Sequence, residues 1–313
     1  MMPKESLVSV IITTRNRKRD ILECLDTLYK QSYKNLEIIL ADNNSEDNTL
    51  QSVSKRFPDV NIVVAKRNLG IAGGRNLAQR EAKGYYYFYL DSDTILHEDC
   101  IKELVNFLSE HKDVGMVVPK MYYFDYPDHI WFAGSTIDLF TSRTINFGTN
   151  EKDVGQYDEP RECAHGPTAF MVTKEVVDIV RGHDETYFMT YADADFAVRT
   201  KKAGFKIFCV PSAKLWHRLN MEENRSGIRA LGYNLPLRAY YFSRNRVLFM
   251  KKNSSAAIFA FFLLFIFPLF TIYYTLKIIQ YKGKFIYLKN HLIGSWDGLK
   301  YALFNHLDNT RFN

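Results

Sequence analysis

The first 220 residues alternate between short apolar segments and amphipathic segments, and this alternation restricts the fold more than any other feature of the chain. Residues 7–14 (LVSVIITT) are rich in β-branched side chains, which is typical of a buried strand, and residues 18–31 repeat Ile and Leu at helical spacing. The same two patterns recur up to residue 123. Apolar strands that alternate with amphipathic helices predict an α/β fold, in which helices cover both faces of a mostly parallel sheet.

Polar side chains follow four successive predicted strands, at the points where the strands end. In open α/β sheets, ligands bind beyond the carboxyl ends of the strands. A single Asp or Asn at such a position is usually a helix cap or a turn residue, but four polar strand ends together predict a shared ligand pocket. The residues concerned are Thr13, Thr14, Arg15, Asn16, Asp42, Asn43, Asn68, Asp91 and Asp93.

Two of these residues, Asp91 and Asp93, form a pattern suited to a divalent cation. Side chains two residues apart share one face of a strand only while the strand stays regular, so a common site depends on how the backbone turns at Ser92. Paired carboxylates hold hard cations such as Mg²⁺ or Mn²⁺, which share their remaining positions with phosphate oxygens and water. The spacing alone is common by chance and does not establish a metal site.

The glycine-rich segment NLGIAGGRN (residues 68–76) fits neither the dinucleotide-binding template nor the P-loop template. Gly70, Gly73 and Gly74 nevertheless allow the backbone to approach a ligand closely. Arg75 in the same segment either contacts a diphosphate or lies on a solvated helix surface.

An uncharged run of 24 residues, 253–276, indicates attachment to a membrane. As a helix it would extend about 36 Å, enough to cross a hydrocarbon core of about 30 Å. Pro268 lies inside the run and leaves two alternatives open. The run is either a kinked helix that crosses the membrane once, or a re-entrant hairpin that turns at the proline.

The net charge of the chain lies almost entirely beside this run. Residues 251–313 contain eight Lys or Arg and two acidic residues, whereas acidic and basic residues balance in residues 1–250. A nucleic-acid-binding protein would usually carry its basic surface on the folded body. A basic flank beside an apolar run instead favours an anionic membrane surface as the partner, and no nucleic acid.

The cysteines and the N-terminal segment favour a cytoplasmic location for the folded body of the chain. Cys24, Cys100, Cys163 and Cys209 lie far apart, without the spacing of a zinc site or a disulfide framework. The apolar run from Leu7 is too short for a signal peptide. The expected location is therefore the cell membrane, with the catalytic domain on the cytoplasmic side.

These patterns divide the chain into four predicted parts. We expect a catalytic domain, an interfacial helical segment rich in Arg and aromatic residues, a transmembrane or re-entrant segment, and a basic amphipathic tail. Their predicted ranges are 1–225, 226–252, 253–276 and 277–313.

Residues 6–250 resemble the family-2 glycosyltransferases of the GT-A fold, and most of all their rhamnosyltransferase-like and galactofuranosyltransferase-like members. The motifs that carry the resemblance occur in the family's order: VSVIITTRNR, LADNNSEDNT, NLGIAGGRN, YLDSD, GPTAFMV, DETYFMTYADADFAVR and KLWH. The resemblance implies a GT-A nucleotide-diphospho-sugar transferase fold with C-terminal membrane-associated helices. It also implies an inverting, metal-dependent transfer of sugar from a UDP- or dTDP-sugar to a hydroxyl of a lipid-linked or polysaccharide acceptor.

The resemblance also implies roles for individual residues. Asp193 is the expected general base, and Asp91, Asp93 and His217 are the expected ligands of Mg²⁺ or Mn²⁺. Asp42 is expected to meet the pyrimidine base, and Asp91 also lies near the ribose. The full set expected to bind the nucleotide sugar is Thr14, Arg15, Asp42, Asn68, Gly70, Arg75 and Asp91.

The chain departs from the family pattern at Ala192, where many relatives carry an acidic residue directly before the base. Two further functions remain open. One is a polyprenyl-phosphate sugar synthase of the same fold, whose acceptor is a lipid phosphate that needs little base catalysis. The other is a non-catalytic scaffold subunit that binds nucleotide sugars, for which Ala192 is the hint. Asp195 is expected to cap its helix or to pair with Arg199.

Overall fold

The central sheet begins with parallel strands in the N-terminal half of the chain. Strand β1 lies between β2 and β4, and β3 extends the sheet beyond β2. The bounds are β1 (Val8–Thr14), β2 (Leu36–Asp42), β3 (Asn61–Val64) and β4 (Tyr86–Asp91). Every residue of β1 is buried, as expected for a strand covered on both faces. The computed structural model describes residues 5–222, 228, 231–233, 235–281 and 285–307.

The second half of the sheet contains reversed strands, of which β11 is the central one. β11 (Ala169–Thr173) runs antiparallel between β4 and β6 (Val114–Tyr123), and β12 (Lys206–His217) pairs parallel with β6. The shorter strands are β5 (Thr94–Leu96), β7 (Ile130–Phe132), β8 (Ser135–Asp138), β9 (Arg143–Asn146) and β10 (Arg161–Glu162). The predicted α/β architecture with a mostly parallel sheet is confirmed.

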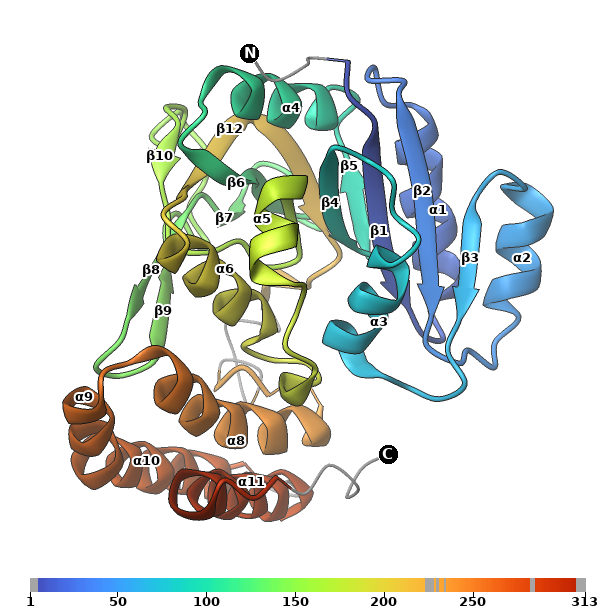
Figure 1. The fold of residues 1–313 in the computed structure, drawn as a ribbon. Helices are drawn as coiled ribbons and strands as arrows, with labels where there is room; N and C mark the ends of the chain where they lie inside the picture. The colour runs from blue at the N-terminus through green and yellow to red at the C-terminus, as the bar shows by residue number, and fades with distance from the viewer. Residues whose placement is uncertain (1–4, 223–227, 229–230, 234, 282–284, 308–313) are drawn as a thin grey trace.

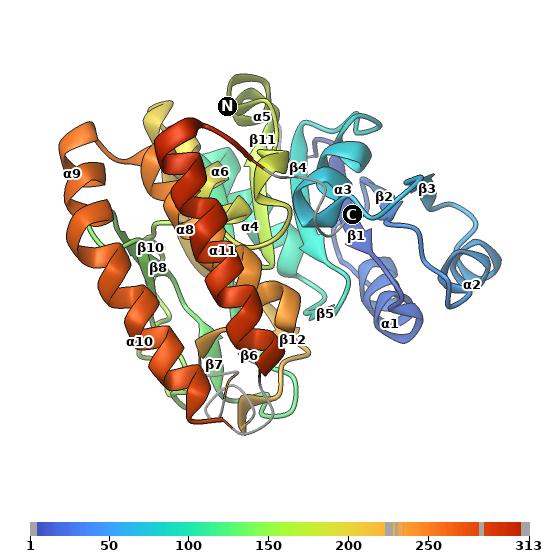
Figure 2. The same ribbon diagram turned by 90° about the horizontal axis from the view of Figure 1, so that it is seen from below.

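Helices cover the sheet on both faces, with α3, α5 and α6 on one side and α1 on the other (Figure 1, Figure 2). Their bounds are α1 (Lys18–Tyr29), α2 (Thr49–Arg56), α3 (Gly70–Gln79), α4 (Cys100–Glu110), α5 (Lys174–Val180) and α6 (Ala192–Lys202), with a 3₁₀ helix η1 (Glu185–Tyr187) before α6. α6 carries acidic residues in its first turn and basic residues in its last. It is followed by Gly204 with a φ of +95°.

The strand register brings the polar strand ends to one edge of the sheet. Thr14 pairs with Asp42, and Thr13 pairs with Asp91. After Asp91 the chain turns and enters β5, which pairs antiparallel with the end of β12, so that Thr94 lies opposite His217. This pairing brings His217, far away in the sequence, next to the turn that carries Asp93.

The C-terminal helices form a layer beneath the catalytic body, which is the part of the chain from β1 to β12 (Figure 1). Their bounds are α8 (Pro236–Asn253), α9 (Ala256–Phe261), a π-helical stretch η3 (Phe262–Ile266), α10 (Phe267–Ile279) and α11 (Phe285–Phe304). Residues 223–227, 229–230, 234, 282–284 and 308–313, which belong to three of the predicted parts, lie outside the described residues.

The apolar run does not turn at Pro268. Ala256–Ile279 is one helix of 24 residues, long and apolar enough to cross a membrane. Because proline lacks an N–H group, it leaves a carbonyl of the preceding turn without its usual partner, and the π-helical stretch directly before Pro268 accommodates this change. The structure therefore has a continuous helix here, without the turn that the re-entrant alternative would need.

Candidate active site

Asp91, Asp93 and His217 meet at the carboxyl edge of the sheet. Each side chain offers one ligand atom, and the three atoms lie within 4.8 Å of one another. Nε2 of His217 lies 3.3 Å from Oδ1 of Asp93. Its Nδ1 is buried and has no hydrogen-bond partner among the described residues. The ring packs edge-on against Trp131, with centroids 4.7 Å apart, which holds the imidazole in place.

The two carboxylates of this cluster differ in their electrostatic surroundings. Burial raises the pKa of Asp93, but the neighbouring His217 and Arg17 outweigh burial and lower the pKa of Asp93 to about 2. Arg17 donates a hydrogen bond to Oδ2 of Asp93 at 2.8 Å. Burial raises the pKa of Asp91 above its ordinary value, against the attraction of Arg75. Asp93 is therefore ionised, whereas a cation beside Asp91 would favour the ionised form of that buried carboxylate.

Arg75 is fully buried and joins the cluster to Asp193. Its guanidinium donates to Oδ1 of Asp91 at 2.9 Å and also to Oδ1 of Asp193. The aromatic rings of Tyr89 and Phe170 lie 6.0 Å and 5.5 Å from its central carbon. The alternative of a solvated helix surface for Arg75 is therefore wrong. Arg75 instead fixes two carboxylates that come from β4 and α6.

Asp193 lies in the first turn of α6 and points back to the sheet edge. Burial raises the pKa of Asp193, but Arg75 and His183 outweigh burial and lower the pKa to about 2. Nε2 of His183 lies 3.7 Å from Oδ1 of Asp193. The Asp193 carboxylate is therefore ionised at neutral pH and is held in one orientation. Asp195, by contrast, accepts a hydrogen bond from Arg199 at 2.7 Å, in agreement with the predicted pairing.

Three further basic side chains lie near these carboxylates. Burial lowers the pKa of both His165 and His183 to about 4, so both are neutral at pH 7. Neither ring nitrogen of His165 has a partner among the described residues. Arg238, on α8, acts electrostatically on Asp91, while burial lowers its pKa. Only its position before the acidic segment, in GHDETYF, could have indicated His183.

The residues predicted to bind the nucleotide lie around the ends of β1 and β2. Oγ1 of Thr14 and Oδ1 of Asp42 are buried without a hydrogen-bond partner among the described residues, while Oδ2 of Asp42 accepts from the Ser45 N–H at 2.8 Å. Arg15 is exposed at the adjoining loop. Buried polar atoms without a partner are uncommon, so the free oxygens of Thr14 and Asp42 indicate a ligand or water at this edge.

The glycine segment approaches this edge through a tight backbone arrangement. Oδ1 of Asn68 accepts a hydrogen bond from the Gly70 N–H at 3.0 Å. Gly70 has a φ of +71°, and a Cβ atom there would lie 2.2 Å from the carbonyl oxygen of Phe188. Only glycine fits this position.

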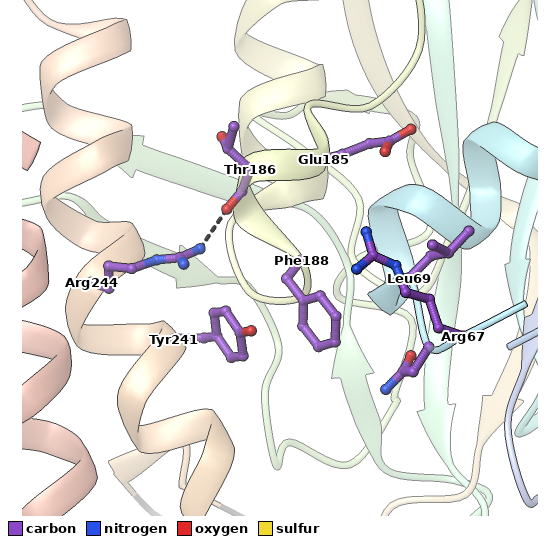
Figure 3. Close-up of a pocket in the computed structure, with 8 residues that line it drawn as sticks. Arg67, Leu69, Glu185, Thr186, Phe188, Tyr241 and Arg244 are labelled. Atoms are coloured by element: carbon purple, nitrogen blue, oxygen red, sulfur yellow. Dashed lines mark hydrogen bonds between the residues drawn. The ribbon is translucent and has the colours of Figure 1, made fainter. Parts of the chain in front are cut away.

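A separate pocket of about 200 Å³ lies between the catalytic body and α8 (Figure 3). Arg244 donates a hydrogen bond to the Thr186 carbonyl oxygen, and the ring of Tyr241 stacks on Phe188 with centroids 4.8 Å apart. The lining residues are Arg67, Asn68, Leu69, Glu185, Thr186, Phe188, Tyr241 and Arg244. Of the predicted site residues, only Asn68 lines this pocket.

Replacing Arg75 with Met is expected to lower the free energy of unfolding by about 3 kcal/mol, because it leaves two largely buried carboxylates without their counter-charge. Since the pKa of Asp193 is depressed from 3.8 to about 2, the stabilisation is present above a pH of about 4 and is lost as the pH falls through about 2. Denaturant unfolding of the wild type and the variant, from neutral pH down to a pH of about 2, measures the loss of stability and its pH dependence.

The matched control is Arg80→Met, because Arg80 follows α3 directly, is mostly exposed, and lies 3.9 Å from Glu185. An exposed pair of this kind contributes at most about 0.5 kcal/mol. Equal losses of stability in the two variants would contradict the bridging role of Arg75.

The chain is similar in sequence to known glycosyl transferases. The profile of the family described as "Glycosyl transferase family 2" matches residues 9–175. The dTDP-rhamnosyl transferase RfbF of Shigella flexneri is 26% identical over 317 residues, which cover 94% of this chain and 96% of that protein. The amylovoran biosynthesis glycosyltransferase AmsB of Erwinia amylovora is 26% identical over 216 residues, covering 66% of this chain and 68% of that protein.

Two solved structures share the fold. The structure of GalNAc-T7 with UDP, GalNAc and Mn²⁺ has a TM-score of 0.59 and 15% identity, and the match covers 82% of this chain but only 54% of that one. The mannosyltransferase PcManGT from Pyrobaculum calidifontis, in complex with GDP-Man and Mn²⁺, has a TM-score of 0.57 and 16% identity, with 96% and 88% covered. These likenesses confirm the predicted GT-A fold.

Proposed function

The chain belongs to glycosyl transferase family 2, and we propose that it transfers a sugar from a UDP- or dTDP-sugar, with inversion, to a hydroxyl group of a lipid-linked or polysaccharide acceptor. That the chain is a hexosyl-transferring enzyme follows from the family and from its named relatives. The proposed donor rests on the full-length similarity to a dTDP-rhamnosyl transferase and on the pyrimidine preference that the resemblance implies.

The observation that carries this proposal is the cluster of Asp91, Asp93 and His217. Two carboxylates and an imidazole whose Nε2 lies 3.3 Å from Oδ1 of Asp93 are suitable ligands for Mn²⁺ or Mg²⁺. A divalent cation held there would offset the negative charge that develops on the departing diphosphate. The similar structures were solved with Mn²⁺, which supports a divalent cation but does not select between the two metals.

Residues on the nucleotide side bind and orient the donor in this proposal. Asp42 and Thr14 offer their unpaired oxygens to the base, and Arg15, Asn68 and Gly70 lie around the donor. Asp91 lies between this region and the other two cation ligands, Asp93 and His217, because Thr13 pairs with Asp91 in the sheet. The donor would therefore lie along the carboxyl edge of the sheet, with its diphosphate at the metal cluster.

Asp193 takes the proton from the acceptor hydroxyl in this proposal, as that oxygen attacks the anomeric carbon. A carboxylate with a pKa of about 2 is a weak base, and Arg75 is one cause of the low value. Arg75 also binds Asp91. A diphosphate at the cluster would draw the guanidinium toward itself, weaken its hold on Asp193 and raise the proton affinity of that carboxylate. Donor binding and base activation are thereby coupled through one side chain.

Attachment to the cytoplasmic face of the cell membrane completes the proposal. The apolar helix Ala256–Ile279 and the basic C-terminal flank support it. An anionic bilayer surface would attract this flank, and a lipid-linked acceptor would be available at that surface.

The direct test is a nucleotide-release assay with a panel of UDP- and dTDP-sugars, using bacterial membrane lipids as the source of acceptor. We expect release of one nucleoside diphosphate above the background, dependent on Mn²⁺ or Mg²⁺ and abolished by a chelator. Normal donor binding without turnover for every acceptor extract would instead support the scaffold-subunit alternative.

A further inference from the structure

We propose that the apolar helix Ala256–Ile279 does not cross the membrane, but lies in the membrane plane beside α11, so that the two helices form a flat lipid-embedded base under the catalytic body. This inference deepens the membrane attachment proposed above and rests on it. The partner is a bilayer with anionic lipids. The argument depends on how this helix packs along its whole length.

The helix runs antiparallel to α8 and contacts it at both ends. Near its start, Phe262 is buried in one cluster with Val247 and Leu248, which lie toward the end of α8. Near its end, Ile278 packs in one cluster with Ala239, at the start of α8. Between them, Arg246 of α8 lies 4.2 Å over the ring of Phe270. Side chains of the two helices therefore meet near both ends and in the middle.

Helix α8 is itself held against the catalytic body by hydrogen bonds from its C-terminal half. Asn245 donates to the carbonyl oxygen of Tyr187 at 2.7 Å, Lys252 contacts Asp184, and Asn253 donates to Asp195 at 2.9 Å. If the apolar helix crossed the bilayer, α8 would lie beside it inside the hydrocarbon, and the charged residues of the catalytic body would be carried there too. Charged side chains and irregular backbone are not stable facing lipid.

The exposed side of the apolar helix is a continuous stripe on one face. Its large exposed residues are separated by three or four positions, apart from two adjacent pairs, and such a pattern covers one side of an α-helix. They are Phe261, Leu264, Phe265, Leu269, Ile272, Tyr273, Leu276 and Ile279. Helix α11 adds exposed Phe285, Ile286, Leu292, Trp296, Leu303 and Phe304. Figure 2 shows the two helices side by side on the underside of the molecule, opposite the sheet.

Charge favours a lipid bilayer over a second copy of the chain as the partner of this surface. Residues 251–313 carry the whole net positive charge of the sequence. Two copies joined through this surface would bring two basic flanks together, whereas anionic lipid headgroups would neutralise them. Lys289 is exposed on α11 beside the apolar residues, where a long side chain can reach the headgroups.

Depth measurements with single spin labels test the proposal on the full chain. The four native cysteines are buried, so the label attaches to an introduced cysteine in each of Ala257→Cys, Leu264→Cys, Ile272→Cys and Ile279→Cys. In vesicles of phosphatidylcholine and phosphatidylglycerol we expect all four labels at one shallow depth, about 5–10 Å. A maximum depth of about 15 Å in the middle, with the two ends in opposite leaflets, would overturn the proposal.

A charge variant supplies a second, independent measurement. The double substitution Leu264→Glu and Leu269→Glu alters residues that are 68% and 65% exposed, so the fold should be retained, which thermal unfolding checks. We expect at least tenfold weaker binding to the mixed vesicles, with unchanged turnover in detergent. Val154→Glu, on an exposed loop of the catalytic body, is the control and should bind normally.

Undiminished vesicle binding by the double variant, or labels that couple between two copies and do not contact lipid, would overturn the proposal. Neither the depth of the labels nor the binding to vesicles depends on turnover. A failure of the in-plane arrangement is therefore distinguishable from a failure of the proposed activity.

Discussion

Replacing Asp193 with Asn is expected to lower sugar transfer to a hydroxyl acceptor about a thousandfold, because an amide cannot take the proton from the attacking oxygen. Asn has nearly the same shape and can still accept a hydrogen bond from Arg75, so the donor should bind with little change. The measurement is the transfer rate at saturating donor, together with a calorimetric titration of the donor. A loss confined to the transfer rate is the expected signature of a base.

The choice of acceptor makes this experiment discriminating. A lipid phosphate is already ionised and needs little base catalysis, so a polyprenyl-phosphate sugar synthase would retain most of its rate in Asp193→Asn. The control is Asp195→Asn on the same helix. Asp195 bonds Arg199, Tyr187 and Asn253, so this variant should lose stability but keep its rate. A normal rate to hydroxyl acceptors in Asp193→Asn would contradict the assigned role.

Replacing Asp93 with Ala is expected to lower turnover at least a hundredfold and to remove its dependence on Mn²⁺. Asp93 lies 3.3 Å from His217 and is ionised, so its loss leaves the proposed cation with one carboxylate and one imidazole. Turnover measured against Mn²⁺ concentration separates weaker metal binding from slower chemistry.

Asp20 provides the matched control for this variant. It shares Arg17 with Asp93, at 3.2 Å against 2.8 Å, but belongs to α1 and lies outside the cluster. Asp20→Ala should therefore retain the turnover and the metal dependence of the wild type. Full turnover of Asp93→Ala with its usual metal dependence would contradict the proposed site.

Much of the catalytic body could be predicted from the sequence, because local patterns determine its strands and helices. The β-branched run at residues 7–14 became the buried β1, and the helical spacing of Ile and Leu in residues 18–31 became α1. Polar residues at strand ends gathered at one edge because parallel strands share a register, as Thr14 and Asp42 show.

The partners of the site residues could not be predicted in the same way. Arg75 occupies a glycine-rich segment that also fits a solvated helix, and only the tertiary structure shows that it is buried between two carboxylates. His183 and Arg238 come from segments without a chemical motif. The orientation of the apolar helix could not be predicted either. Hydropathy shows that the helix is long and apolar enough to cross a membrane, but its orientation depends on how it packs against α8.

The most direct test of the account is a calorimetric titration of UDP and dTDP into the wild-type protein, once with Mn²⁺ and once with a chelator. Since the diphosphate is proposed to bind at Asp91, Asp93 and His217 through a divalent cation, the account predicts heat of binding with the metal and none without it. Equal affinity under both conditions would contradict a metal-dependent site at this edge of the sheet.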